Sequence, residues 1–165
     1  AGVATGTIYR HFESREDLFA EIFRLATQRE VDKVAEALAI TGNAVQRLDH
    51  ALRQFAQRAL KGPMKAWALI AEPVDPKVEE ERLVYRKAYA NLFEQAIRSG
   101  ITEGCIPDQD ARLTSTCLVG AISESLVGPL SPTQTETPPG HDNNEDELVD
   151  TIVCFCLRGL TGTRS

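Results

Sequence analysis

The sequence predicts an all-α protein in which a short N-terminal segment is joined by one long helix to a larger helical domain. Apolar residues recur every three or four positions through most of the 165 residues, which is the spacing of one helix face, and no segment reads as a strand. Residues that cap helices stand before these apolar stretches, and Gly or Pro residues stand after them.

The long helix is predicted to run from Ser14 to about Ile40. Ser14 is a good N-cap, and Asp17 three residues later makes an approximate capping box. Gly42 is a natural residue for the position just past the end of this helix.

Three further helices follow in order. Asn43 is expected to cap a helix that ends at Gly62 and Pro63. A short apolar helix over residues 64–71 is expected to be buried on most sides. Asp75 then caps a long helix that Gly100 and Gly104 are expected to close.

The C-terminal part contains two more helices. Asp108 or Asp110 is expected to cap a helix over residues 111–127 that is rich in small residues, and residues 128–144 are predicted to form a surface loop. The last helix, residues 145–160, is apolar on more than one side. One domain has only one interior, so this helix needs a second partner, and another copy of the chain is the simplest one.

Composition bounds the function. The length fits one domain, or one domain with a fragment of another, and no apolar run is long enough to predict a membrane span. The net charge is −6, but residues 113–157 hold seven acidic residues and no Lys or Arg. The four cysteines and three histidines show no metal-ligand spacing, so we expect no metal, no cofactor and reduced thiols.

Residues 1–12 read AGVATGTIYRHF and are followed by a capped, charged turn at Ser14. This string is typical of the second half of a helix-turn-helix, beginning at the turn and continuing through a short second helix, about residues 4–11. The first half of the motif does not precede it, so we expect a longer protein whose N-terminal arm, first helix and most of the second helix are absent here.

The ordered residues of this segment, above all Tyr9, His11, Phe12 and Ser14, resemble the DNA-binding domain of the TetR family of transcriptional regulators. The resemblance implies a partial DNA-binding domain at residues 1–28 and an effector-binding and dimerisation domain at residues 29–165. It also implies double-stranded operator DNA as a partner. The DNA-contacting residues that it implies are Thr5, Thr7, Tyr9, Arg10, His11, Ser14 and Arg15.

The resemblance further implies a ligand-responsive repressor that is cytoplasmic and forms a homodimer through its last two helices. An apolar or aromatic small-molecule effector is expected, because such ligands bind in apolar pockets with few polar groups. Aromatic residues at helical spacing also commonly form plain core. The candidate ligand-binding residues are the large side chains of the central helices, namely Phe55, Met64, Trp67, Tyr85, Tyr89, Phe93, Leu118 and Ile122.

Two other classes of function can be built on an all-helical chain. An enzyme needs a catalytic constellation, and the sequence offers no Glu-x-x-His pair, no nucleophile with a base and no glycine-rich phosphate loop. An all-helical small-molecule-binding or interaction module without DNA binding remains an alternative, because residues 1–30 carry four Arg against five acidic residues and form no basic patch.

Overall fold

The computed structural model describes residues 12, 14–132 and 145–162, and these residues form six helices. No strand occurs among them, so the predicted all-α fold is confirmed. The helix predicted over residues 4–11 and most of the predicted loop at 128–144 lie outside the described residues. The six helices are α1 (Arg15–Leu38), α2 (Ala44–Lys61), α3 (Pro63–Ile70), α4 (Pro76–Glu103), α5 (Ala111–Leu130) and α6 (Glu145–Thr161).

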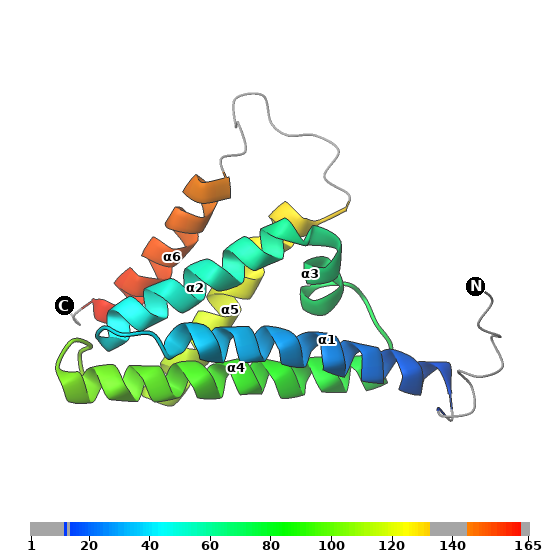
Figure 1. Cartoon of the computed structure of the whole chain (residues 1–165), viewed down its shortest axis with the longest axis horizontal. Coiled ribbons are helices and arrows are strands. Elements are labelled where there is room, and N and C mark those ends of the chain that lie inside the picture. The colour runs from blue at the N-terminus through cyan, green and yellow to red at the C-terminus, as the bar shows by residue number, and fades with distance from the viewer. Residues whose placement is uncertain (1–11, 13, 133–144, 163–165) are drawn as a thin grey trace.

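Helices α1 and α4 lie side by side and run in the same direction, while α2, α3 and α6 lie on one side of this pair and α5 crosses behind it (Figure 1). The parallel register follows from cross-helix contacts. Lys77 pairs with Asp17 near the start of both helices, and Arg24 pairs with Glu81 one or two turns later, with 2.7 Å between nitrogen and oxygen. The long helix is therefore held along the length of α4.

Side chains cap the helices at the predicted positions. The Asn43 side chain accepts the Gln46 backbone N–H at 3.0 Å, and Gln46 accepts the Asn43 N–H in return, which forms a full capping box. The side chains of Ser14 and Asp75 also accept backbone N–H groups at the starts of α1 and α4, and Asp110 rather than Asp108 caps α5. Local side-chain chemistry therefore sets where these helices begin.

Helix ends differ from the prediction in three places. Helix α1 ends at Leu38 with Ala39 as its C-cap, short of Ile40 and of the Gly42 that was expected to follow its end. Gly100 does not close α4 but lies inside it, and the helix continues to Glu103 before Gly104 ends it with a left-handed φ of 76°. Helix α5 runs three residues past Val127 to Leu130, because Leu130 is only 4% exposed and its packing holds the last turn in place.

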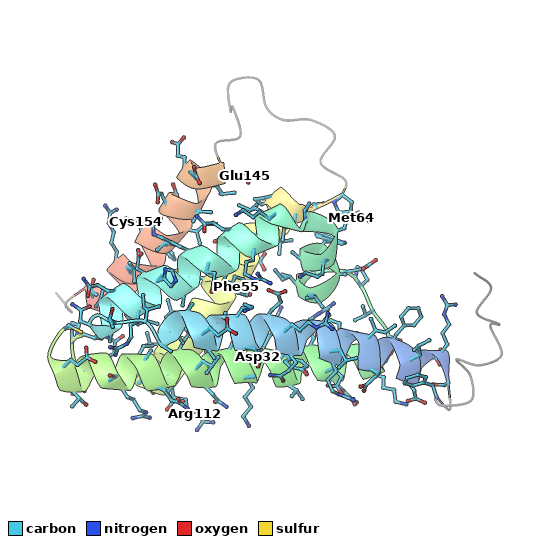
Figure 2. The ribbon with its side chains drawn as sticks, in the orientation of Figure 1. Asp32, Phe55, Met64, Arg112, Glu145 and Cys154 are labelled. Atoms are coloured by element: carbon cyan, nitrogen blue, oxygen red, sulfur yellow. The ribbon has the colours of Figure 1, made fainter. Side chains whose placement is uncertain are left out.

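Helix α3 is the clearest correction. It was expected to be buried on most sides, yet Ala66 is its only buried residue and Met64 is 88% exposed (Figure 2). With eight residues, α3 lies on the outside of the bundle and turns one face inward. This apolar helix is therefore partly open to solvent and does not lie in the centre of the core.

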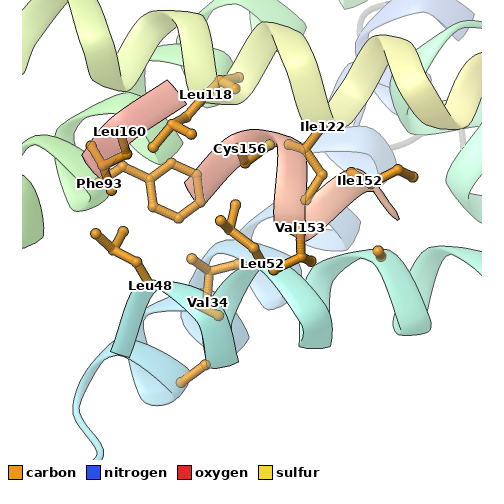
Figure 3. Close-up of a cluster of buried hydrophobic side chains, with 14 of the residues drawn as sticks. Val34, Leu48, Leu52, Phe93, Leu118, Ile122, Ile152, Val153, Cys156 and Leu160 are labelled. Carbon is orange, nitrogen blue, oxygen red and sulfur yellow. The ribbon is translucent and has the colours of Figure 1, made fainter. Parts of the chain in front are cut away.

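The main core joins α2, α5 and α6 to the C-terminal half of α4, and Phe93, Leu52 and Val153 meet there (Figure 3). A smaller cluster lies between the N-terminal halves of α1 and α4, around Phe23, Val78 and Tyr85. Helix α5 has the length and mean hydropathy (1.3) of a membrane span, but it contributes seven buried residues to this bundle, and we assign it to the core.

Candidate ligand-binding site

A cavity of about 60 Å³ lies where α1, α2, α3, α4 and α5 approach one another. Its apolar wall is formed by residues from all five helices. Phe55 and Tyr89 meet edge to face across it, with ring centroids 5.6 Å apart and an interplanar angle of 87°. The other large apolar lining residues are Phe23, Leu69, Ile70 and Val119.

Four residues that carry a hydroxyl group line the cavity, namely Thr27, Tyr85, Tyr89 and Ser123, and two of these hydroxyls donate to the backbone. Thr27 donates to the Phe23 carbonyl at 2.8 Å, and Tyr85 donates to the Arg24 carbonyl at 3.0 Å. The Tyr89 hydroxyl makes no hydrogen bond with any residue of the described ranges, and burial raises the pKa of this phenol. Tyr89 is therefore a neutral donor that a ligand can use.

Positive charge surrounds the cavity. Arg58, Lys65, Arg82 and Arg86 line it, against the single carboxylate of Glu30. This excess of cations contrasts with the net charge of −6 of the whole chain. A site with an apolar wall and a cationic edge suits a ligand that has an apolar part and an anionic part.

Glu30 connects three helices at this edge. Its carboxylate accepts hydrogen bonds from Arg58 Nε at 2.8 Å and from Lys65 Nζ at 2.6 Å. Burial raises the pKa of Glu30, but the bonds from Arg58 and Lys65 outweigh that effect and leave the pKa below its ordinary value. Glu30 is therefore ionised at neutral pH, and it links α1 to α2 and α3.

Arg82 is a buried cation with a structural role. Its guanidinium donates to the carbonyls of Leu69 at 3.1 Å and Glu72 at 2.8 Å, and it pairs with Glu79 at 2.6 Å. These carbonyls lie at the end of α3, where a helix leaves acceptors unpaired. Arg82 therefore fixes the end of α3 to α4.

The eight predicted ligand-binding residues occupy three kinds of position. Phe55, Tyr85 and Tyr89 line the cavity. Phe93, Leu118 and Ile122 are at most 4% exposed in the main core, and Trp67 packs against that core from α3. Met64 points into solvent.

Sequence reasoning missed the contribution of α1 to the cavity, which is Phe23, Thr27 and Glu30. It also missed the basic residues. Arg58 and Lys65 lie 28 and 35 residues from Glu30, and no local pattern marks such pairs.

At the other end of α1, two of the predicted DNA contacts can be placed. The Ser14 hydroxyl accepts the Asp17 N–H at 3.1 Å, so it is occupied as a helix cap. The Arg15 guanidinium lies over the Phe19 ring, 5.1 Å from its centroid, and is exposed. Thr5, Thr7, Tyr9, Arg10 and His11 lie outside the described residues.

A second hollow, of about 330 Å³, opens between α5 and α6. Leu113 and Phe155 on its rim are 61% and 68% exposed, and the exposed Cys117 lies beside them. Within the described residues no group of three or more His, Cys, Asp or Glu could hold a metal ion. This second hollow is thus an exposed apolar surface on the two C-terminal helices.

Family models match most of the chain. The model described as bacterial regulatory proteins, tetR family, matches residues 1–22, and the model described as Tetracyclin repressor-like, C-terminal domain, matches residues 41–127. A curated relative, the fatty acid metabolism regulator protein of Bacillus subtilis (strain 168), is 24% identical over 130 residues, which are 77% of this chain and 67% of the relative.

Solved structures of similar fold include two with acyl-coenzyme A. The transcriptional regulator FadR from Bacillus subtilis, in complex with stearoyl-CoA, has a TM-score of 0.79 at 20% identity, covering 96% of this chain and 83% of that one. AibR, in complex with isovaleryl coenzyme A and operator DNA, has a TM-score of 0.65 at 17% identity, covering 95% and 80%.

Proposed function

The chain belongs to the TetR family of bacterial transcriptional regulators, and from this premise we propose that it represses genes from a DNA operator until an acyl-CoA thioester binds it. We choose this effector because of the cavity that the five helices α1 to α5 line. It combines an apolar wall with four cations and one carboxylate. An acyl chain matches the wall, and the phosphates of coenzyme A match the cations.

The size of the cavity favours a ligand that changes the structure. A volume of about 60 Å³ has room for about two water molecules at the roughly 30 Å³ that each occupies in the liquid, which is less than a long acyl chain requires. The acyl chain of the ligand must therefore displace part of the cavity wall. Helix α3 is the part held least firmly, because only Ala66 of its eight residues is buried.

We propose a homodimer formed through α5 and α6. The exposed Leu113 and Phe155 form the apolar surface there, and Gly120 offers space because a Cβ at this position would meet no atom within 4 Å. Two reading heads must lie about 34–36 Å apart to enter successive major grooves, which a dimer provides.

In this proposal residues 1–28 read DNA and residues 29–165 bind effector and partner. Helix α1 crosses that boundary without a break, so movement at the cavity is transmitted to the reading end. The curated relative is a regulator, and we propose that this chain likewise acts without catalysis, in the cytoplasm where its operator lies.

The test is operator binding by the intact gene product, measured by fluorescence anisotropy on its own promoter DNA. Stearoyl-CoA is expected to weaken binding, with coenzyme A alone as the control. Tyr9→Ala is expected to weaken binding to all sequences and to reduce the salt dependence by about one phosphate contact. A promoter that never binds, or binding that stearoyl-CoA leaves unchanged, would contradict the proposal.

A further inference from the structure

The cations best placed to hold an anionic ligand group are already occupied by a side chain of the protein. Arg58 uses two nitrogens on the Glu30 carboxylate, at 2.8 and 3.1 Å, and Lys65 adds a third bond at 2.6 Å. All three residues line the cavity. The Glu30 side chain is 15% exposed, whereas those of Arg58 and Lys65 are 38% and 53% exposed. The cations therefore remain accessible from solvent while their carboxylate partner faces inward.

A phosphate group is a stronger partner for this pair than a carboxylate. It carries more charge and more acceptor oxygens, and the planar guanidinium of Arg binds two of them at once. We propose that the anionic group of the effector replaces Glu30 as the partner of Arg58 and Lys65, and thereby releases α1 from α2 and α3. This inference rests on the proposed function above and adds the residues that couple effector binding to the long helix.

The replacement has a structural consequence because Glu30 cannot stay where it is. A largely buried carboxylate that loses its cationic partners is costly until it reaches water. Helix α1 stays attached to α4 through the Arg24–Glu81 pair and the Tyr85 hydroxyl. Motion of the segment around Glu30, away from α2 and α3, is therefore the expected response.

The test compares effector binding by four variants, with stearoyl-CoA as the probe and isothermal titration calorimetry as the measurement. Glu30→Gln removes the negative charge that competes with the ligand for Arg58 and Lys65 but keeps the shape of the side chain. Stearoyl-CoA should therefore bind this variant about three- to tenfold more tightly than the wild type. Lys65→Met removes one cation and should weaken binding by a similar factor. Asp32→Asn, an exposed position on α1, and Lys61→Met, an exposed position on α2, are matched controls and should match the wild type.

Two further measurements identify the anionic group that binds and show whether its binding loosens α1. Stearate carries a carboxylate in place of the phosphates, so an effect of Glu30→Gln on stearoyl-CoA alone assigns the site to phosphate, and an effect on both ligands assigns it to anions in general. Hydrogen exchange of amides in residues 26–34 should speed up when stearoyl-CoA binds the wild type, and should already be faster in ligand-free Glu30→Gln.

The outcomes separate the two proposals. If stearoyl-CoA binds the wild type, Glu30→Gln and Lys65→Met with equal affinity, the exchange of Glu30 for ligand is refuted while the acyl-CoA effector stands. If neither stearoyl-CoA nor stearate binds any of the proteins, both proposals fail. Weaker binding by Glu30→Gln would also refute the exchange, because it would make Glu30 part of the binding surface rather than its competitor.

Discussion

At Gly100 the absence of a side chain allows two helices, α4 and α2, to approach closely. A Cβ there would lie 2.4 Å from Ile106 Cδ1 and 2.8 Å from the Ala44 Cβ. Ile106 is 3% exposed and Ala44 is fully buried, so neither has free space to move into. The glycine therefore permits α4 to pass close to the start of α2.

Gly100→Ala is accordingly expected to destabilise the protein by about 1–3 kcal/mol through overpacking. Urea denaturation followed by circular dichroism measures this change. Asn91→Ala, at an exposed position of the same helix, is the control and should not lower the stability, because alanine is the better helix former. Equal stability of the two variants would show that the contact around Gly100 is looser than described.

Arg82 is a second residue whose replacement should destabilise the fold. Arg82→Met removes the donors to the Leu69 and Glu72 carbonyls and should cost about 1–3 kcal/mol in free energy of unfolding. Arg82→Lys should recover only part of this, because an ammonium group cannot reach the same acceptors in a fork. Lys87→Met, an exposed change on the same helix, is the control, and a loss as large as that of Arg82→Met would contradict the assignment.

Between elements, Glu103 ties the end of α4 to the start of α2. Its carboxylate accepts hydrogen bonds from Ser99 at 2.6 Å, Arg47 at 2.7 Å and the Ala44 N–H at 2.8 Å. These bonds, that of Ser99 first, lower the pKa of Glu103 from 4.5 to about 2. One side chain thus joins two helix ends that are far apart in sequence.

The pH dependence of stability follows from that lowered pKa. The stabilisation by Glu103 is complete above about pH 4.5 and is lost as the pH falls towards about 2, because the folded state then has to take up a proton it binds poorly. Glu103→Gln should therefore be less stable than the wild type at pH 7, and the difference should shrink below pH 4.5. Glu94→Gln, which breaks a pair confined to α4, serves as control in thermal unfolding at pH 7 and pH 3. A difference that stays constant across this range would refute the role of Glu103.

How far the sequence predicts each element depends on whether its cause is local. The caps at Ser14, Asn43 and Asp75 were predicted because a cap involves residues two or three positions apart. The exposure of Met64 could not be predicted, because the sequence of a short apolar helix does not show whether another element covers its outer face. The Glu30 cluster depends on tertiary proximity, so no single-sequence pattern reveals it.

For the molecule as a whole, the proposed dimer makes the surface of α5 and α6 the place to test. Phe155→Glu puts a charge on a side chain that is 68% exposed in the single chain and should raise the dimer dissociation constant at least about tenfold. Leu83→Glu makes the same kind of change on α4, at a side chain that is 58% exposed, and should leave the dimer intact. Sedimentation velocity distinguishes the two species, and a dimer that survives Phe155→Glu would place the interface elsewhere.

The unbroken course of α1 turns a small rotation into a useful displacement. The fifteen residues from Glu30 back to Arg15 span about 22 Å of helix axis. The Lys77–Asp17 and Arg24–Glu81 pairs hold this part of α1 to α4, so the two helices tilt together. A joint tilt of about 5° at the level of Glu30 moves the Arg15 end by about 2 Å, and in the proposed symmetric dimer the two ends move apart or together by about twice that distance. In the proposed dimer, a small angular change at the effector site therefore alters the spacing between the two reading heads.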